Sequence, residues 1–486
     1  MSVSSGAPSL AECPSDVITR LLVMLDVLGL ARLELVSLQL RAEAQMEAMR
    51  RSSGGRGFPP TRWQWARECQ RATQSKLGRL AASNHTLCST GSGQLIGFGS
   101  NCAGQLGLGH FRHEWLPVPA MAEVPGMESR ITGVAAGFLH SAVWDAAGRV
   151  WVAGDNEFGQ IGPIDREVAF GIPFRRRRRR GPPSAVPVQI QFPRMVQGSV
   201  VQVSCGLSFT VILTDRGSLF SFGANDVGQL GIGSHEDDES PNIAVEVKRV
   251  AGLDDAFITQ VAAGSAHAIA LTDDGRAFSW GDRSDGRLGL TESAQLRISE
   301  KTGIVDLDRV ACLTPTQIHV MHARKWRVQR VACGFAHSML IANDGELWAF
   351  GWNDDFQLGV TSERCFKQLP SHAELPNGAR AAEVSCGRSH TVILDTNGRV
   401  WMVGDNTSGQ CGIPWMVSIR TFVAVDVCAI AQVAAGHAHT VLMDTRGRLW
   451  TCGWTDCGRL GQGLVAEDHP TKCVSPCSVG LLVDEG

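Results

Sequence analysis

Six histidines recur at the same place in a repeated string of this 486-residue sequence. Imidazole is a common metal ligand and general base, so regularly spaced histidines raise the question of a metal centre or a catalytic site. Each one belongs to its own copy of the string, however, and residues at equal offsets in separate copies cannot converge on one ion. We therefore predict that each imidazole satisfies backbone groups inside its own repeat. The six are His85, His140, His267, His337, His390 and His439.

Signatures of catalysis are missing from the sequence. No GxxxxGK[ST] phosphate loop, GxSxG nucleophile elbow or HExxH zinc motif occurs. His437 and His439 are two residues apart on an expected strand, but no cysteine or carboxylate completes a metal site with them. Carboxylates such as Asp273 and Asp274 fall in expected hairpin turns, where aspartate is common. We predict a protein that is not an enzyme and that holds no metal and no cofactor.

Composition narrows the class of protein and its compartment. The formal net charge of −3 argues against a general attraction to nucleic acid or to an anionic membrane. No stretch reaches the roughly 18 apolar residues of a membrane span, and the first ten residues lack the pattern of a secretory signal. The 15 cysteines are odd in number and form no CxxC pair, which favours free thiols in a reducing compartment. We expect a cytoplasmic or nuclear protein, or both.

The elements that must position the histidines come from one string that occurs seven times. It reads Val-Ala-Ala-Gly, two residues, His, an apolar run, a Gly-centred turn, an apolar-aromatic run ending in Gly, and Gly-Gln-Leu-Gly. The clearest copies are 261–289 and 433–461, and the first, from Leu80, has one residue fewer before its histidine. The apolar runs of four to six residues predict strands, and turns such as Asp-Asp-Gly predict hairpins. The third copy has Phe209 at the histidine position.

The spacing of the closing glycines, about 50 to 70 residues, is in the range of propeller blades. These strings resemble the regulator-of-chromosome-condensation repeat family over about Leu77 to the C-terminus. The resemblance implies a mainly β fold, a seven-bladed β-propeller over residues 77–486, with inserts near 163–198 and 290–328. Closing the ring would remove exposed sheet edges. The sequence does not show which strand closes it.

Two inserts carry strong charge. One holds six consecutive arginines and the other the acidic string Glu-Asp-Asp-Glu at 236–239. A block of like charges stays solvated, so one interpretation of the arginines is a plain loop. The alternative is a nuclear-import or anion-binding patch. The arginines are Arg175, Arg176, Arg177, Arg178, Arg179 and Arg180.

The residues before the propeller follow a helical rather than a strand pattern. Pro14-Ser15-Asp16 is a helix-start signal, and apolar residues follow at helical spacing up to about Met49. We predict a three-helix unit within residues 1–50, followed by a linker and short helix over 51–76. The stretch from Cys13 to Arg41 resembles an F-box, although Cys13 stands where leucine is usual. The alternative is a helical cap on the propeller.

The F-box resemblance implies a function. Its helices would bind the Skp-type adaptor of a cullin–RING ubiquitin ligase, while the propeller presents a protein substrate and other subunits transfer ubiquitin. Two alternatives remain: a guanine-nucleotide exchange factor for a small GTPase, which the propeller family also contains, and a passive scaffold. No basic chromatin tail precedes the helices, since Met1 to Cys13 contains no lysine or arginine. The predicted adaptor-binding residues are Pro14, Val17, Leu21, Leu25, Leu30, Leu33 and Val36.

Overall fold

The computed structural model describes eleven stretches of the chain: residues 79–90, 93–121, 130–162, 183–193, 196–233, 243–291, 311–319, 327–360, 364–427, 429–463 and 472–479. By internal contacts the chain divides into Met1–Lys76 and Leu77–Gly486, and all described residues belong to the second unit. The F-box-like stretch, with every predicted adaptor-binding residue, lies outside the described residues, as do Arg175 to Arg180. Within the described part, no helix is long and apolar enough to cross a membrane.

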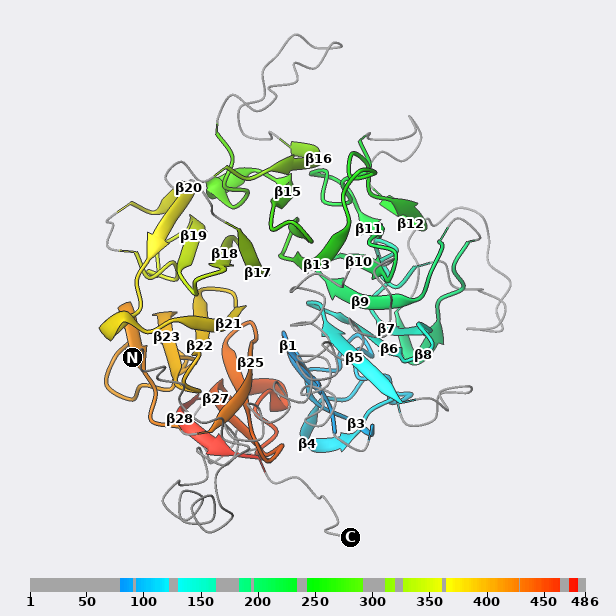
Figure 1. Ribbon diagram of the computed structural model, residues 1–486. Coiled ribbons are helices and arrows are strands. Elements are labelled where there is room, and N and C mark those ends of the chain that lie inside the picture. Colours follow the sequence, from blue (N-terminus) through cyan, green and yellow to red (C-terminus); the bar gives the residue numbers. More distant parts are fainter. Residues whose placement is uncertain are drawn as a thin grey trace, which may run out of the picture. The chain divides into compact units, whose positions relative to one another are not determined.

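The described residues form seven antiparallel sheets of four strands, arranged around a centre as the blades of a propeller (Figure 1). The four strands of each blade are consecutive in sequence and pair in order from the centre outward. This confirms the predicted seven-bladed fold. We number the blades one to seven along the chain.

The first and second strands of each blade lie nearest the centre. The first strands are β1 (Arg79–Ala82), β5 (Ile131–Ala136), β9 (Val200–Cys205), β13 (Ile258–Ala263), β17 (Val328–Cys333), β21 (Ala381–Cys386) and β25 (Ile430–Ala435). The second strands are β2 (His85–Ser89), β6 (His140–Asp145), β10 (Phe209–Thr214), β14 (His267–Thr272), β18 (His337–Ala342), β22 (His390–Asp395) and β26 (His439–Asp444).

The third and fourth strands complete each blade toward the rim. The third strands are β3 (Leu95–Gly99), β7 (Val150–Gly154), β11 (Leu219–Ala224), β15 (Ala277–Asp282), β19 (Leu347–Trp352), β23 (Val400–Asp405) and β27 (Leu449–Trp454). The fourth are β4 (Glu114–Pro119), β8 (Ser184–Gln189), β12 (Ile243–Arg249), β16 (Ala311–Gln317), β20 (Phe366–Ala373), β24 (Ser418–Ala424) and β28 (Lys472–Ser478). Short 3-10 turns occur at Ser284–Gly286, Pro376–Gly378 and Asp456–Gly458.

The second strand of every blade is buried along its whole length. Strand β10, Phe-Thr-Val-Ile-Leu-Thr, is an example: its residues are apolar or small on both faces because neighbouring blades cover both. A tight turn then reverses the chain into β11. Gly217 in that turn has a φ of +72°, and a Cβ there would lie 2.8 Å from the Phe257 ring, so only glycine fits.

The hydrophobic core lies mainly between blades rather than at one centre. Trp144 of β6 and Phe222 of β11, for example, belong to one buried cluster between blades two and three. Each blade therefore contributes side chains to two clusters, one on each face. Loss of one blade would expose apolar surface on both of its neighbours, which is why the repeats stabilise one another.

The ring closes between the first strands of blades seven and one. β1 packs against β25, and the main-chain N–H of His437 donates to the carbonyl oxygen of Ser83 over 2.8 Å. The C-terminal strand β28 is the outermost strand of blade seven and pairs only with β27 among the described strands. Among the described strands, closure therefore rests on contact between blades and not on an exchanged strand.

Antiparallel order places the loops of each blade on two opposite faces. The turn from the first to the second strand lies at the same end as the connection from the third to the fourth. We call this end the mouth face. The chain enters the arginine insert after Gly162 and the acidic insert after Gly233, and both positions follow third strands.

Candidate functional site

The repeated histidines bind the neighbouring blade. In six interfaces the imidazole Nε2 lies within hydrogen-bond distance of a serine or threonine hydroxyl on the second strand of an adjacent blade. The pairs are His85–Ser141 (2.6 Å), His140–Thr210 (2.9 Å), His267–Ser338 (2.9 Å), His337–Thr391 (2.9 Å), His390–Thr440 (3.0 Å) and His439–Thr86 (3.2 Å). Our prediction of backbone partners inside the same repeat was therefore wrong, because the ring faces the next blade.

The hydroxyls require a proton on Nε2 of the rings, and burial keeps the rings neutral. The Ser141 hydroxyl donates to the carbonyl oxygen of Gln105 over 2.7 Å, and its single hydrogen is thereby used. It must then accept from the Nε2–H of His85, so Nε2 carries a proton, while Nδ1 finds no hydrogen-bond partner. Burial lowers the pKa of His85 to about 3, which agrees with a neutral ring. Four other hydroxyls donate in the same way, those of Thr210, Ser338, Thr391 and Thr440.

One interface of the ring uses different chemistry. Blade three carries Phe209 instead of histidine, and blade four carries Ala268 where its neighbours have a hydroxyl. The carbonyl oxygen of Gln229 would then lack its usual donor. The indole Nε1–H of Trp280 supplies one instead, at 3.0 Å. Three coordinated replacements therefore keep the buried carbonyl of Gln229 satisfied without a histidine–hydroxyl pair.

These contacts give the histidines a structural role. The described residues contain no group of three or more His, Cys, Asp or Glu side chains placed to hold a metal ion. The histidines lie on separate blades, and each is bonded through Nε2 to a hydroxyl of the next blade. They link the blades in pairs around the ring.

A shallow pocket opens on the mouth face, at the centre of the ring. It encloses about 530 Å³, including space open to solvent, and the turns between first and second strands of all seven blades line it. Hydrogen bonds between neighbouring turns hold its rim: Phe138 N–H donates to Gly206 O at 3.3 Å, and Phe335 N–H to Gly387 O at 3.1 Å. The mouth is thus a preformed surface built by many distant segments of the chain.

The rim is uneven because the turn of blade one is one residue shorter. Every other blade presents one side chain directly after its turn glycine, and blade one presents none. The flanking side chains Phe138 and His437 meet across this position, with ring centroids 5.6 Å apart. Burial and the positive charges of Arg388 and Arg459 lower the pKa of His437 to about 4. The His437 ring is therefore neutral, and the rim at this position is aromatic.

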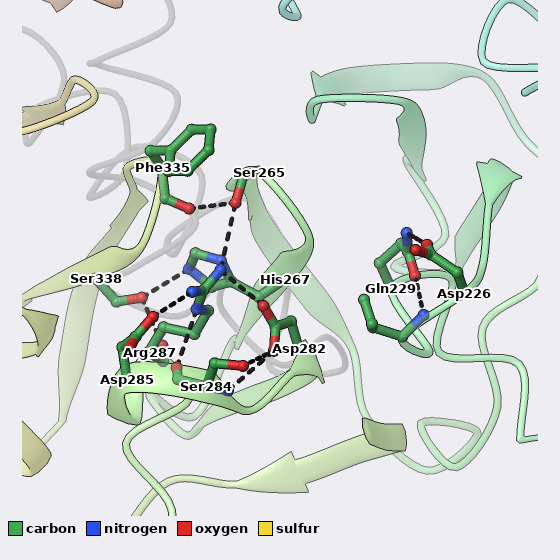
Figure 2. A network of polar contacts seen from close by, with 11 residues as sticks. Asp226, Gln229, Ser265, His267, Asp282, Ser284, Asp285, Arg287, Phe335 and Ser338 are labelled. Carbon is green, nitrogen blue, oxygen red and sulfur yellow. Dashed lines mark hydrogen bonds and ion pairs between the residues drawn. The ribbon is translucent and has the colours of Figure 1, made fainter. Parts of the chain in front are cut away.

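Arg287 lies close to the mouth in blade four, in a network of ion pairs (Figure 2). Its Nη1 lies 2.9 Å from Asp282 Oδ2 and its Nη2 lies 2.6 Å from Asp285 Oδ2. The same guanidinium reaches the Ser265 hydroxyl on the rim at 3.4 Å. Although the side chain is only 8% exposed, its charge is balanced.

Arg459 occupies the same repeat position in blade seven without those carboxylates. Trp454 and Cys457 stand where blade four has Asp282 and Asp285. The guanidinium carbon lies 4.5 Å from the centre of the Trp454 ring, and Nε and Nη1 find no hydrogen-bond partner. Burial lowers the pKa of Arg459. The aromatic face of Trp454 and the nearby charge of Asp456 compensate this cation, but no carboxylate bonds directly to the two unpaired nitrogens.

Blade six presents the most exposed apolar segment of the mouth face. In the connection from β23 to β24, Trp415 is 80% exposed, Met416 40% and Val417 67%. Buried Asn406 holds the segment: its Nδ2 donates to the carbonyl oxygens of Ile413 (2.7 Å) and Met416, and its N–H donates to Val417 O at 3.0 Å. The exposed side chains are therefore displayed by a fixed backbone.

Sequence reasoning missed the hydroxyl partners of the histidines and the exposed segment at Trp415. The sequence does contain a signal for the hydroxyl partners: serine or threonine follows five of the six repeat histidines, and Thr210 follows Phe209. Trp415 had a weaker one, an apolar run where other repeats continue with polar residues. The adaptor-binding residues Pro14 to Val36 and the arginine block lie outside the described residues, so the structure places none of them at the mouth.

Comparison with known proteins agrees with the repeat geometry. A model of the regulator of chromosome condensation (RCC1) repeat matches residues 92–144, 147–213, 216–271, 274–341 and 344–394. A second model of this repeat matches 131–160, 200–229, 258–287, 328–357, 381–410 and 430–459. These stretches cover the second and third strands of every blade but the first, where the match begins with the third strand.

Two curated relatives and one solved structure are similar. The X-linked retinitis pigmentosa GTPase regulator homolog of Caenorhabditis elegans is 30% identical over 68% of this chain, which spans only 23% of that protein. The secretion-regulating guanine nucleotide exchange factor of Bos taurus is 30% identical over 65% of this chain and 61% of its own length. Yeast RCC1 (Prp20), bound to Kap60, matches with a TM-score of 0.66 and 20% identity, over 85% of this chain and 87% of its own, and shares the fold.

The repeat models cover more than half of the sequence. The strands of the blades coincide with these repeats, and both observations lead to one assignment. The chain belongs to the regulator of chromosome condensation (RCC1) repeat family.

Proposed function

We propose that this chain is a non-catalytic protein-binding subunit whose propeller receives a protein substrate on the mouth face. The observation that carries the proposal is the fixed, exposed segment Trp415–Val417. Exposed tryptophan on a rigid support is typical of the residues that dominate protein interfaces. Arg388 and Phe335, on the turns of blades six and five, add a stacked cation and ring 5.9 Å apart on the same face.

We further propose that the N-terminal segment attaches the propeller to a Skp-type adaptor and its cullin complex. The support is the F-box-like pattern from Cys13 to Arg41, with Leu21 and Leu25 on the expected binding face. In this arrangement the propeller selects a substrate and other subunits transfer ubiquitin. Such a subunit requires no active site of its own.

A pull-down with purified Skp adaptor tests the attachment. We expect the full chain to retain the adaptor and a chain that begins at Ser75 to lose it. Leu21→Asp places a charge in the predicted contact and should abolish binding, whereas Leu10→Asp, outside the matched stretch, should leave it unchanged. If the full chain does not bind the adaptor, the ligase proposal fails, while substrate binding at the mouth face is still tested separately through Trp415.

The second candidate function is nucleotide exchange on a small GTPase. Its support is the similarity to the bovine exchange factor over 65% of this chain. An exchange factor also works without catalytic motifs, because it distorts the nucleotide site of its partner. Release of a fluorescent guanine nucleotide from a panel of small GTPases tests it. Acceleration by the chain beginning at Ser75, without Skp adaptor, would favour exchange over the ligase role.

The arginine block supports a proposal about location. Six adjacent cations suit an import receptor, so we propose that Arg175 to Arg180 direct the protein to the nucleus. Replacing all six with glutamine and imaging a fluorescent fusion tests this. Retention in the cytoplasm is the expected result, and an unchanged distribution would leave the block as a plain loop.

A further inference from the structure

The outermost strand of every blade carries the same bulge. In each, two residues four apart on the fourth strand pair with two residues only two apart on the third. In blade seven, Cys473 pairs with Gly453 and Cys477 with Thr451. The intervening residues loop out, so side chains at positions i and i+4 lie beside each other.

Blade seven places cysteine at both positions. The sulfur atoms of Cys473 and Cys477 lie 3.3 Å apart, and the Cys473 thiol also donates to the carbonyl oxygen of Ser475 at 3.0 Å. Cys477 is exposed and Cys473 is half-buried, so reagents in solution reach the pair.

Blade four shows that the bulge, and not the cysteines, sets this geometry. There Cys312 and Thr316 occupy the equivalent positions, and the Cys312 sulfur lies 3.3 Å from the Thr316 hydroxyl. A hydroxyl cannot form a disulfide, so blade four provides a matched control within the same chain.

We propose that Cys473 and Cys477 are a redox-modification site, a dithiol that hydroperoxides convert reversibly into a disulfide. One cysteine loses its proton, and its thiolate attacks a peroxide oxygen: an S–O bond forms, the O–O bond breaks, and the leaving hydroxide or alkoxide takes up the released proton as water or an alcohol. The second thiol then attacks the sulfenic sulfur, so that the S–S bond forms, the S–O bond breaks and water leaves. The two thiols lose two electrons and the peroxide gains them. A dithiol reductant reverses the step.

The surroundings of the two cysteines set the rate of disulfide formation and its effect on the fold. Burial and the adjacent Cys473 thiol raise the pKa of Cys477 to about 11, so the reaction should accelerate as the pH rises toward that value. The bulge packs on blade six, where Pro476 lies against Gly412 and Lys472 Nζ donates to Thr407 O at 3.1 Å. A disulfide would therefore fix the last strand at the contact between blades six and seven.

Thiol mapping of the full chain tests the site, independently of the proposed function. The native protein is treated with hydrogen peroxide, free thiols are blocked with N-ethylmaleimide, and tryptic peptides are weighed. Cleavage after Lys472 leaves both cysteines in one C-terminal peptide, and cleavage after Arg309 leaves Cys312 in another. We expect the C-terminal peptide to lose two hydrogen atoms and to escape alkylation, and dithiothreitol to reverse this. Cys312 should stay alkylated.

Two variants complete the test. Cys477→Ser should abolish the oxidised peptide without changing the thermal midpoint of the reduced protein. Thr316→Cys should create a second peroxide-dependent disulfide, with Cys312, because it reproduces the pair on an identical bulge. Full alkylation of Cys473 and Cys477 after peroxide, or separate sulfinic acids on the two, would overturn the proposal.

Discussion

The indole Nε1–H of Trp280 donates to the main-chain carbonyl oxygen of Gln229 over 3.0 Å, across the interface of blades three and four. At five other interfaces, a hydroxyl bonded to a histidine fills this place. A buried carbonyl between blades needs a hydrogen-bond donor, and this interface supplies it in a second way, with Phe209, Ala268 and Trp280.

The second solution should be transferable to the interface of blades four and five. There His267, Ser338 and Phe350 occupy the positions of Phe209, Ala268 and Trp280. Ser338→Ala alone leaves the His267 Nε2–H and the Arg287 carbonyl unpaired and should cost about 2 to 4 kcal/mol. The triple change His267→Phe, Ser338→Ala, Phe350→Trp should recover most of that loss. Urea denaturation measures both, and a triple variant less stable than the single one would contradict the interpretation.

Stability should fall steeply in mild acid. Burial lowers the pKa of His85, His140 and His337 to about 3 from an ordinary 6.5, and lowers those of His267, His390 and His439 as well. Below pH 6.5 the unfolded chain therefore binds protons that the folded chain refuses, so stability is complete above pH 6.5 and is lost as the pH falls toward the folded values. Six such sites give a limiting slope of about 8 kcal/mol per pH unit.

Thermal melting between pH 8 and pH 5 checks this dependence. The midpoint should stay nearly constant above pH 7 and drop below pH 6.5. The His267→Phe, Ser338→Ala, Phe350→Trp variant removes one of the six sites and should have a shallower slope, by about 1.4 kcal/mol per pH unit. A midpoint that is flat down to pH 5 would mean that the rings are protonated in the folded protein.

The repeat pattern predicted much of this fold and little of its interfaces. Seven strings with Gly-centred turns specified seven blades, because strand runs and hairpin glycines are local signals. The hydrogen-bond partner of His85 is not a local signal. Ser141 lies 56 residues away in the sequence, and only the packing of the blades brings the two side chains together. The meeting of Phe138 and His437 likewise required the closed ring and the missing residue of the first turn.

Arg287 and Arg459 occupy the same repeat position, but removal of their charge should change the stability of the protein in different ways. Arg287→Met leaves the half-buried Asp282 and Asp285 without their counter-charge and should cost about 1.5 to 3 kcal/mol. Arg459→Met removes a buried cation with unpaired nitrogens and keeps a flexible side chain on Trp454, so stability should be unchanged or higher. Urea midpoints of the two variants decide this, and a comparable loss in both would show that Asp456 and Trp454 compensate the charge of Arg459 as fully as the ion pairs compensate Arg287.

Trp415 should dominate substrate binding without contributing to folding. With 80% of its surface exposed, Trp415→Ala should leave the urea midpoint unchanged. As an interface anchor it should lower partner affinity about 30-fold, the equivalent of about 2 kcal/mol. Phe257 is the control, because it is 46% exposed and lies on the opposite face, in the connection from β12 to β13. Quantitative mass spectrometry of proteins co-purified with each variant measures the effect. Equal losses for Trp415→Ala and Phe257→Ala, or none for either, would remove the mouth face as the binding surface, since only Trp415 is displayed there by the backbone that Asn406 fixes.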